Sequence, residues 1–184
     1  MALFSRWRAE RELKRKAERF VATLMAEPAV EDVTWLASQA TRGDQDHARW
    51  ELRYARRALG VLAAQRDALD DRTGSIVART LDEAFSRDEH IATDMLDVAE
   101  RQFNARLSAY RDVLLARGGG PLAPRLGQTL FAFAGGAFRH VDDNITRAGA
   151  LVSGYLAEAN AALRDAFGAA SLPENVPPSS LAGR

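Results

Sequence analysis

The apolar residues of this chain recur every three or four positions over most of its length, which is the spacing of one face of an α-helix. Glycines and prolines interrupt this pattern at a few places and mark the ends of the elements. The sequence therefore predicts an all-α fold, with helices at about 3–26, 28–41, 44–70, 75–117 and 122–167.

Segment 44–70 is predicted to be the central helix. Gly43 ends the preceding element, and Asp44 is a good N-cap residue. On a helical wheel, polar residues occupy one arc, whereas apolar residues cover both of its flanks. A helix with two apolar faces packs against neighbours on two sides. We expect the polar arc to be a solvated face formed by Arg49, Arg53, Arg56 and Arg57.

The segment after the central helix, residues 75–117, contains no Gly or Pro. Its two apolar stripes overlap on one helical face, which favours a single rod of about 65 Å at 1.5 Å per residue. Ser86 and Asp88 are candidate caps for a second helix if the rod breaks there.

A second long helix is predicted at 122–167. The run from Gly118 to Pro121 predicts a tight turn before it. The apolar spacing then continues across Gly135 and Gly136, which indicates a kinked helix rather than two helices. The expected architecture is an elongated antiparallel helical bundle, in which the two long helices pack on the shorter central helix and two N-terminal helices.

The length of 184 residues is typical of one domain, which we place at residues 1–170. Residues 171–184 are rich in Pro and Ser, so we expect a disordered or surface-draped tail. The chain has no cysteine, which excludes disulfides and thiolate metal sites. It also lacks the run of about 20 apolar residues that crosses a membrane. This composition favours a cytoplasmic protein.

Charge is distributed unevenly, although the formal net charge is zero. Residues 1–26 hold seven basic and three acidic residues and form a predicted basic amphipathic helix. Such a helix can bind a protein partner, another copy of the chain or an anionic membrane surface, whereas its interleaved glutamates disfavour nucleic acid. The candidate contact residues are Phe4, Arg6, Trp7, Arg8, Arg11, Lys14 and Arg15.

Arg106 projects into the apolar face of segment 75–117, where an unpaired guanidinium is too costly to bury. Glu51 is its candidate partner, because it is the acidic residue on an apolar face of the central helix. Gln102 lies one turn from Arg106. Asp88 is also in phase with the apolar arc that contains Arg106, as is Asn144 in the last helix. Glu51, Gln102, Arg106 and Asn144 form a predicted interior polar cluster. Its expected role is to set the helix register, and binding of a small polar ligand is the alternative.

The three histidines make a weak case for a metal site. His47 and Glu51 stand one helical turn apart in an apolar region, so they are the candidate ligands. His90 lies outside its apolar arc, and His140 lies at the edge of its own. The pair of Glu-x-x-His motifs that is typical of ferritin-like di-iron bundles is absent. We therefore expect no metal and no cofactor.

The sequence contains no pattern typical of catalysis. It has no G-x-S-x-G nucleophile elbow, and no Lys-Ser/Thr follows Gly118–Gly120 as in a phosphate loop. The long apolar stripes favour a non-enzymatic interaction or scaffold protein that acts through homo-oligomerisation, most simply as a dimer, and through helix-mediated partner binding. The alternatives are a ligand- or metal-binding bundle and a peripheral membrane protein that uses its N-terminal helix.

Overall fold

The computed structural model describes residues 2–67, 71–137 and 141–168, with side chains from residue 7 onward. Most of these residues are helical and none of them is in a strand, which confirms the predicted all-α class. The predicted tail at 171–184 lies outside the described residues. The helices are α1 (Ala2–Leu24), α2 (Val30–Gln39), α3 (Gln45–Asp67), α4 (Asp71–Phe85), the 3-10 helix η1 (Thr93–Met95), α5 (Leu96–Leu115), α6 (Leu122–Phe133) and α7 (Asp143–Phe167).

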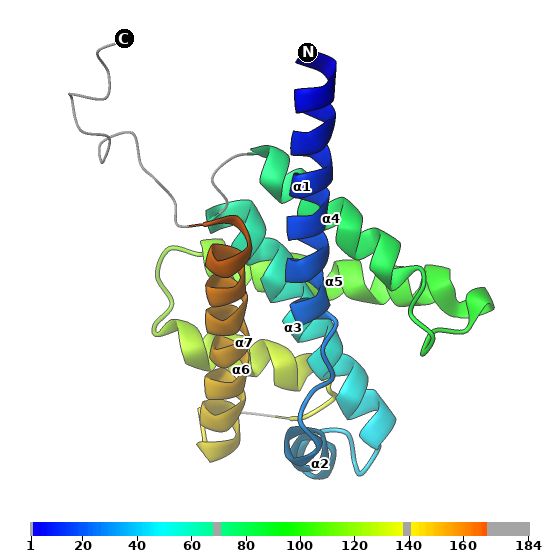
Figure 1. Cartoon of the computed structure of the whole chain (residues 1–184). Helices are drawn as coiled ribbons and strands as arrows, with labels where there is room; N and C mark the ends of the chain where they lie inside the picture. The colour runs from blue at the N-terminus through cyan, green and yellow to red at the C-terminus, as the bar shows by residue number, and fades with distance from the viewer. Residues whose placement is uncertain (1, 68–70, 138–140, 169–184) are drawn as a thin grey trace.

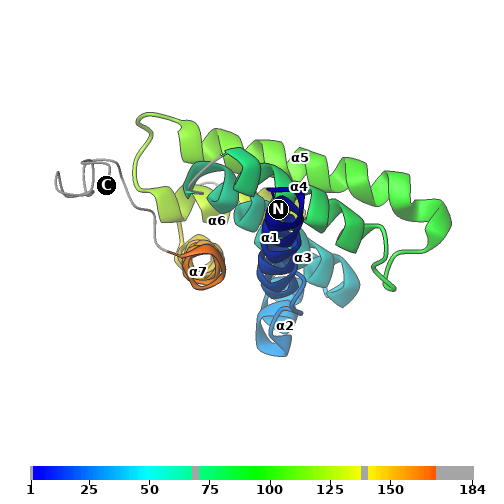
Figure 2. The ribbon, with the colours of Figure 1, turned by 45° about the horizontal axis from the view of Figure 1, so that its top comes forward.

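Helix α3 lies at the centre of the fold, as its two apolar faces predicted. It packs against each of the other six α-helices of the described chain. The Asp44 Oδ1 accepts a hydrogen bond from the His47 backbone N–H at 2.9 Å, so Asp44 is the predicted N-cap. Figure 1 shows α1 and α7 side by side with α5 and α6 running across them, and Figure 2 shows α5 and α2 at opposite edges.

The prediction of a single helix at 75–117 is wrong, because helix α4 ends at Phe85 and helix α5 begins only at Leu96. Between them, the loop places Asp88 against Arg57 of α3, with 2.7 Å from Arg57 Nη2 to Asp88 Oδ2. Both side chains are buried, and a buried guanidinium requires such a partner. Helices α4 and α5 each pack on α3 with their own apolar stripe, so the shared phase does not indicate a continuous helix.

The second long helix, predicted at 122–167, is also two helices. Helix α6 ends in a Schellman motif, in which Gly135 has a φ of 78° and Gly135 and Gly136 donate their N–H groups to carbonyls of α6. Helix α7 restarts with Asp142, whose Oδ1 accepts from the Ile145 N–H at 2.9 Å. The glycine pair therefore ends a helix instead of kinking one. Shorter crossing helices replace the expected elongated pair of rods (Figure 1).

The turn predicted at 118–121 is present between α5 and α6. Its three consecutive glycines have φ angles between 89° and 92°. Only glycine adopts this left-handed conformation without steric cost, so the glycine run is required by the backbone of the turn.

Helices α6 and α7 approach each other closely at two glycines. A Cβ atom on Gly127 would lie 2.4 Å from the Ile145 carbonyl oxygen, and one on Gly149 would lie 2.4 Å from the Ala123 carbonyl oxygen. Both obstacles are backbone atoms, which cannot move aside as a flexible side chain can. The two glycines therefore allow the tight α6–α7 contact.

Replacing Gly149 by Ala is expected to destabilise the protein by about 1–3 kcal/mol, because the added methyl group forces the two helices apart. The matched control is Gly154→Ala in the same helix, where a Cβ meets nothing within 4 Å. There the change should stabilise by about 0.5–1 kcal/mol through helix propensity. Urea unfolding followed by circular dichroism measures both. Equal effects of the two substitutions would contradict the close-approach explanation.

Candidate functional site

The structure brings Glu51 of α3 and Arg106 of α5 together. Arg106 Nε donates to Glu51 Oε2 at 3.1 Å, and Arg106 Nη2 donates to Glu51 Oε1 at 2.5 Å. The guanidinium thus forms a bidentate pair with the carboxylate. Glu51 is 3% exposed and Arg106 is 13% exposed. Because the guanidinium also lies 4.4 Å from the centroid of the Phe133 ring in α6, this ion pair joins three helices.

The other two predicted members of the polar cluster are placed differently. Gln102 is exposed, although its Oε1 accepts from the Tyr54 hydroxyl at 3.1 Å. Asn144 lies apart from the cluster and donates to Gln39 Oε1 at 3.2 Å. Its expected position assumed a continuous helix at 122–167. Because the helix is interrupted between α6 and α7, the helical phase that placed Asn144 beside Arg106 does not hold, and the prediction for Asn144 is wrong.

His47 lies beside the ion pair at the surface of the protein. Its Nε2 is 3.4 Å from Glu51 Oε1 and 3.3 Å from the Phe133 carbonyl oxygen, and its side chain is 40% exposed. Each Glu51 oxygen therefore already has a partner, which leaves this carboxylate poorly suited to act as a free base. Among the described residues, no group of three His, Cys, Asp or Glu side chains could hold a metal ion.

Two arginines of α3 are buried, contrary to the predicted solvated face. Arg57 is 1% exposed and pairs with Asp88, whereas Arg53 is 4% exposed and donates from Nη2 to Glu27 Oε2 at 2.8 Å. Both guanidinium groups lie over the Trp50 ring, at 5.8 and 4.7 Å from its centroid. In the sequence, the burial of these arginines is signalled by Trp50, which stands three residues before Arg53 and seven before Arg57. The face of an aromatic ring attracts a guanidinium group.

Asp88 is the acidic centre of this second buried group. Burial alone would raise the pKa of the Asp88 carboxyl, but hydrogen bonds from His90 and Arg57 outweigh it and lower the pKa below the usual value. The His90 Nδ1 lies 2.9 Å from Asp88 Oδ1. Asp88 therefore stays ionised and holds the loop after α4 against α3.

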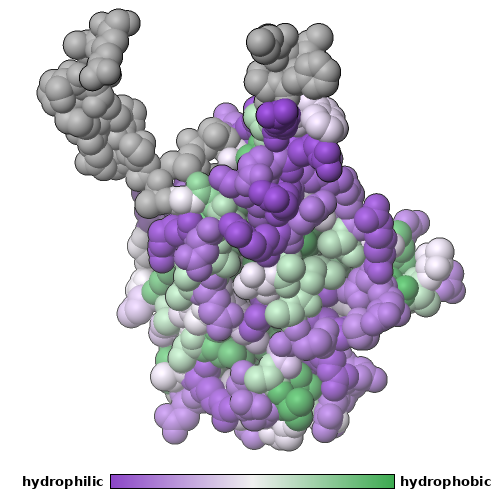
Figure 3. Space-filling view, in the orientation of Figure 1, coloured by the Kyte–Doolittle hydropathy of each residue, from purple (hydrophilic) through white to green (hydrophobic). Residues whose placement is uncertain are grey.

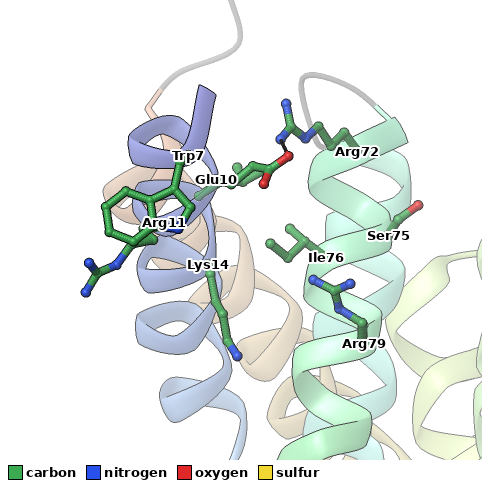
Figure 4. A pocket seen from close by; sticks show the side chains of 9 residues that line it. Trp7, Glu10, Arg11, Lys14, Arg72, Ser75, Ile76 and Arg79 are labelled. Carbon is green, nitrogen blue, oxygen red and sulfur yellow. Dashed lines mark ion pairs between the residues drawn. The ribbon is translucent and has the colours of Figure 1, made fainter. Parts of the chain in front are cut away.

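A cleft lies between α1 and α4, as shown in Figure 4. Its volume is about 590 Å³. Four cationic side chains and one carboxylate contribute to the lining, so the cleft is basic. The lining residues are Trp7, Glu10, Arg11, Leu13, Lys14, Arg72, Ser75, Ile76 and Arg79.

Two ion pairs link the two sides of this cleft. Arg72 of α4 lies 3.5 Å from Glu10 of α1, and Lys14 of α1 lies 3.6 Å from Glu83 of α4. All four side chains are substantially exposed, so each pair contributes little to stability. Arg79 also lies 4.0 Å from Glu83, so of the four cleft cations Arg11 is the one that lies over an aromatic ring, that of Trp7, instead of beside one of these carboxylates.

The N-terminal half of α1 projects beyond the rest of the fold (Figure 1). Buried positions in α1 begin at Ala17, whereas Trp7 is 54% exposed and lies 4.6 Å below the Arg11 guanidinium. We call residues 7–16 the free half of α1. Figure 3 shows mostly hydrophilic surface over this part of α1 and the neighbouring α4.

Five of the predicted contact residues, Trp7, Arg8, Arg11, Lys14 and Arg15, lie together along a second hollow on the free half, of about 640 Å³. Trp7, Arg11 and Lys14 line the cleft. Arg8 and Arg15 are exposed, and Arg15 pairs with Glu12. The side chains of Phe4 and Arg6 lie outside the described residues.

Comparison with protein-family models, curated proteins and solved structures finds no match to this chain. Within the described residues, none of the helices has the length and apolar character needed to cross a membrane. The functional interpretation therefore depends on the geometry of the cleft and of the buried ion pairs.

Replacing Glu51 by Leu is expected to destabilise the protein by about 3 kcal/mol, because the Arg106 guanidinium then stays buried without a carboxylate. The double variant, Glu51→Leu with Arg106→Leu, should recover most of this loss since it removes both charges. Urea unfolding of the single and double variants measures the coupling between the two residues. Unchanged stability of Glu51→Leu would show that the pair is not a structural link.

Proposed function

We propose that this chain is a non-enzymatic helical interaction protein that binds an acidic partner through the free half of α1 and the adjoining cleft. The observation that carries the proposal is an exposed Trp7 beside a cleft with four cations and one lining carboxylate. A projecting helix with an aromatic anchor and flanking cations is a common arrangement in helix-mediated recognition.

The buried polar groups support a binding role over a catalytic one. The Glu51 carboxylate is engaged by Arg106, and Asp88 is engaged by Arg57 and His90. These arrangements stabilise charge inside the fold instead of directing a free base or nucleophile toward a cleft. The basic cleft itself is lined by no histidine, and its one carboxylate, Glu10, lies 3.5 Å from Arg72.

Self-association is the simplest form of this proposal, because the chain has no net charge yet carries a basic cleft. The rest of the chain therefore carries an excess of acidic residues. A second copy can then present acidic residues to the free half of α1. Such contacts between exposed charges weaken as salt screens them.

Size-exclusion chromatography with light scattering tests this proposal on the full chain. We expect species larger than the 20.1 kDa chain at an ionic strength of about 0.05 M, and their dissociation at about 0.5 M. Reversal of two exposed cations, Arg8→Glu with Arg11→Glu, should abolish the association. The matched control is Arg111→Glu with Arg117→Glu, two exposed residues outside the cleft. A monomer under all conditions would contradict the proposal.

Peripheral membrane binding is a second candidate function, favoured by the exposure of Trp7 beside Arg11. Tryptophan and basic residues are typical of helices that lie in a membrane interface. We then expect the full chain to sediment with vesicles that contain phosphatidylserine and not with pure phosphatidylcholine vesicles. Trp7→Ala should reduce the bound fraction severalfold. Absence of binding to anionic vesicles at low salt would exclude this function.

A further inference from the structure

A groove runs between α4 and α5, on the side of α4 that does not face α1. Both helices pack on α3, and residues of all three line the groove, which has a volume of about 220 Å³. Its lining is mainly apolar and includes two phenylalanine rings 5.6 Å apart. The apolar lining residues are Val61, Ala78, Leu81, Phe85, Phe103 and Leu107.

The charged residues at this groove are acidic. Asp82 comes from α4 and Glu100 from α5, and the remaining polar lining residues are the neutral Gln65 and Asn104. No basic residue is part of the lining. The groove therefore combines an apolar floor with a negative rim, and a complementary ligand has an apolar anchor flanked by cations.

The free half of α1 has these properties. Trp7 supplies a large apolar side chain, and Arg8 and Arg11 supply cations within about one helical turn of it. A cavity of about 150 Å³ holds a benzene molecule, so a groove of about 220 Å³ has room for one indole ring. The size of the groove and the sign of its charge thus agree with this segment.

The free half of α1 cannot reach this groove within its own chain. Trp7 lines the cleft between α1 and α4, and buried Ala17 and Phe20 anchor the rest of α1 in the core. The groove lies instead between α4 and α5. The segment is nevertheless available to another molecule, because more than half of the Trp7 side chain is exposed.

We infer that the α4–α5 groove is the docking site for the free half of α1 from a second copy of this chain. Trp7 of one copy enters the groove of the other, and Arg8 and Arg11 face Asp82 and Glu100. This inference rests on the proposed function and names its acidic partner. Because two different surfaces meet, the contact is heterologous, and repetition builds rings or open chains.

A mixing experiment with two full-chain variants tests this contact. The helix variant, Arg8→Glu with Arg11→Glu, keeps an intact groove. The groove variant, Asp82→Arg with Glu100→Arg, keeps an intact α1. Both substitutions of the groove variant change rim residues that are exposed or half-buried, so the core is retained, and circular dichroism melting checks the fold of each variant.

Each variant alone is expected to be monomeric in light scattering. A 1:1 mixture should form a heterodimer, because the α1 of the groove variant docks in the groove of the helix variant. The reversed helix of one variant and the reversed groove of the other also carry opposite charges, so the mixture can assemble beyond a heterodimer as the unmodified chain does. Adding Trp7→Ala to both variants should weaken this association by at least tenfold in dissociation constant.

The possible results separate this inference from the proposed function. A groove variant that associates like the unmodified chain, or a mixture without heterodimer, would overturn the α4–α5 docking site and leave self-association through α1 intact. A monomeric unmodified chain would overturn both. Heterodimer formation that is insensitive to Trp7→Ala would overturn the assignment of the tryptophan to the groove.

Discussion

The burial of charged residues on α3 is the constraint on which the rest of this structure depends. Helix α3 is enclosed by six other helices, yet it carries Glu51, Arg53 and Arg57 at buried positions. A buried charge without a partner costs several kcal/mol, so each of these residues must be met by an opposite charge from another segment. The partners then fix where those segments lie.

The three ion pairs act on three different parts of the chain. Arg106 sets the position of α5 along α3 through its two bonds to Glu51. Asp88 draws the loop after α4 inward to Arg57. Glu27 meets Arg53 and holds the connection between α1 and α2. The path of the chain around α3 follows from these pairs as much as from apolar packing.

Helix α4 separates two surfaces of opposite charge. One side lines the basic cleft with Arg72 and Arg79, and the other side lines the apolar groove with Asp82. A chain of zero net charge can thus carry two complementary surfaces. A head-to-tail contact joins two different surfaces of the same chain, and the proposed one would use α1, which projects from the fold (Figure 1).

The sequence by itself determined the helical class, the central place of α3, the cap at Asp44 and the glycine turn before α6, because these depend on local periodicity and backbone preference. It also pointed to the pairing of Arg106 with Glu51, since a charge inside an apolar stripe demands a partner. Only the tertiary structure decided the helix breaks after α4 and α6. The number of residues in the loop between two helices sets the apparent phase between their apolar stripes. That phase can match the phase of one long helix by coincidence, so periodicity alone does not reveal the break. The burial of Arg53 and Arg57 likewise depends on the tertiary structure. Their partners, Glu27 and Asp88, lie on other segments and reach α3 only once the chain has folded around it.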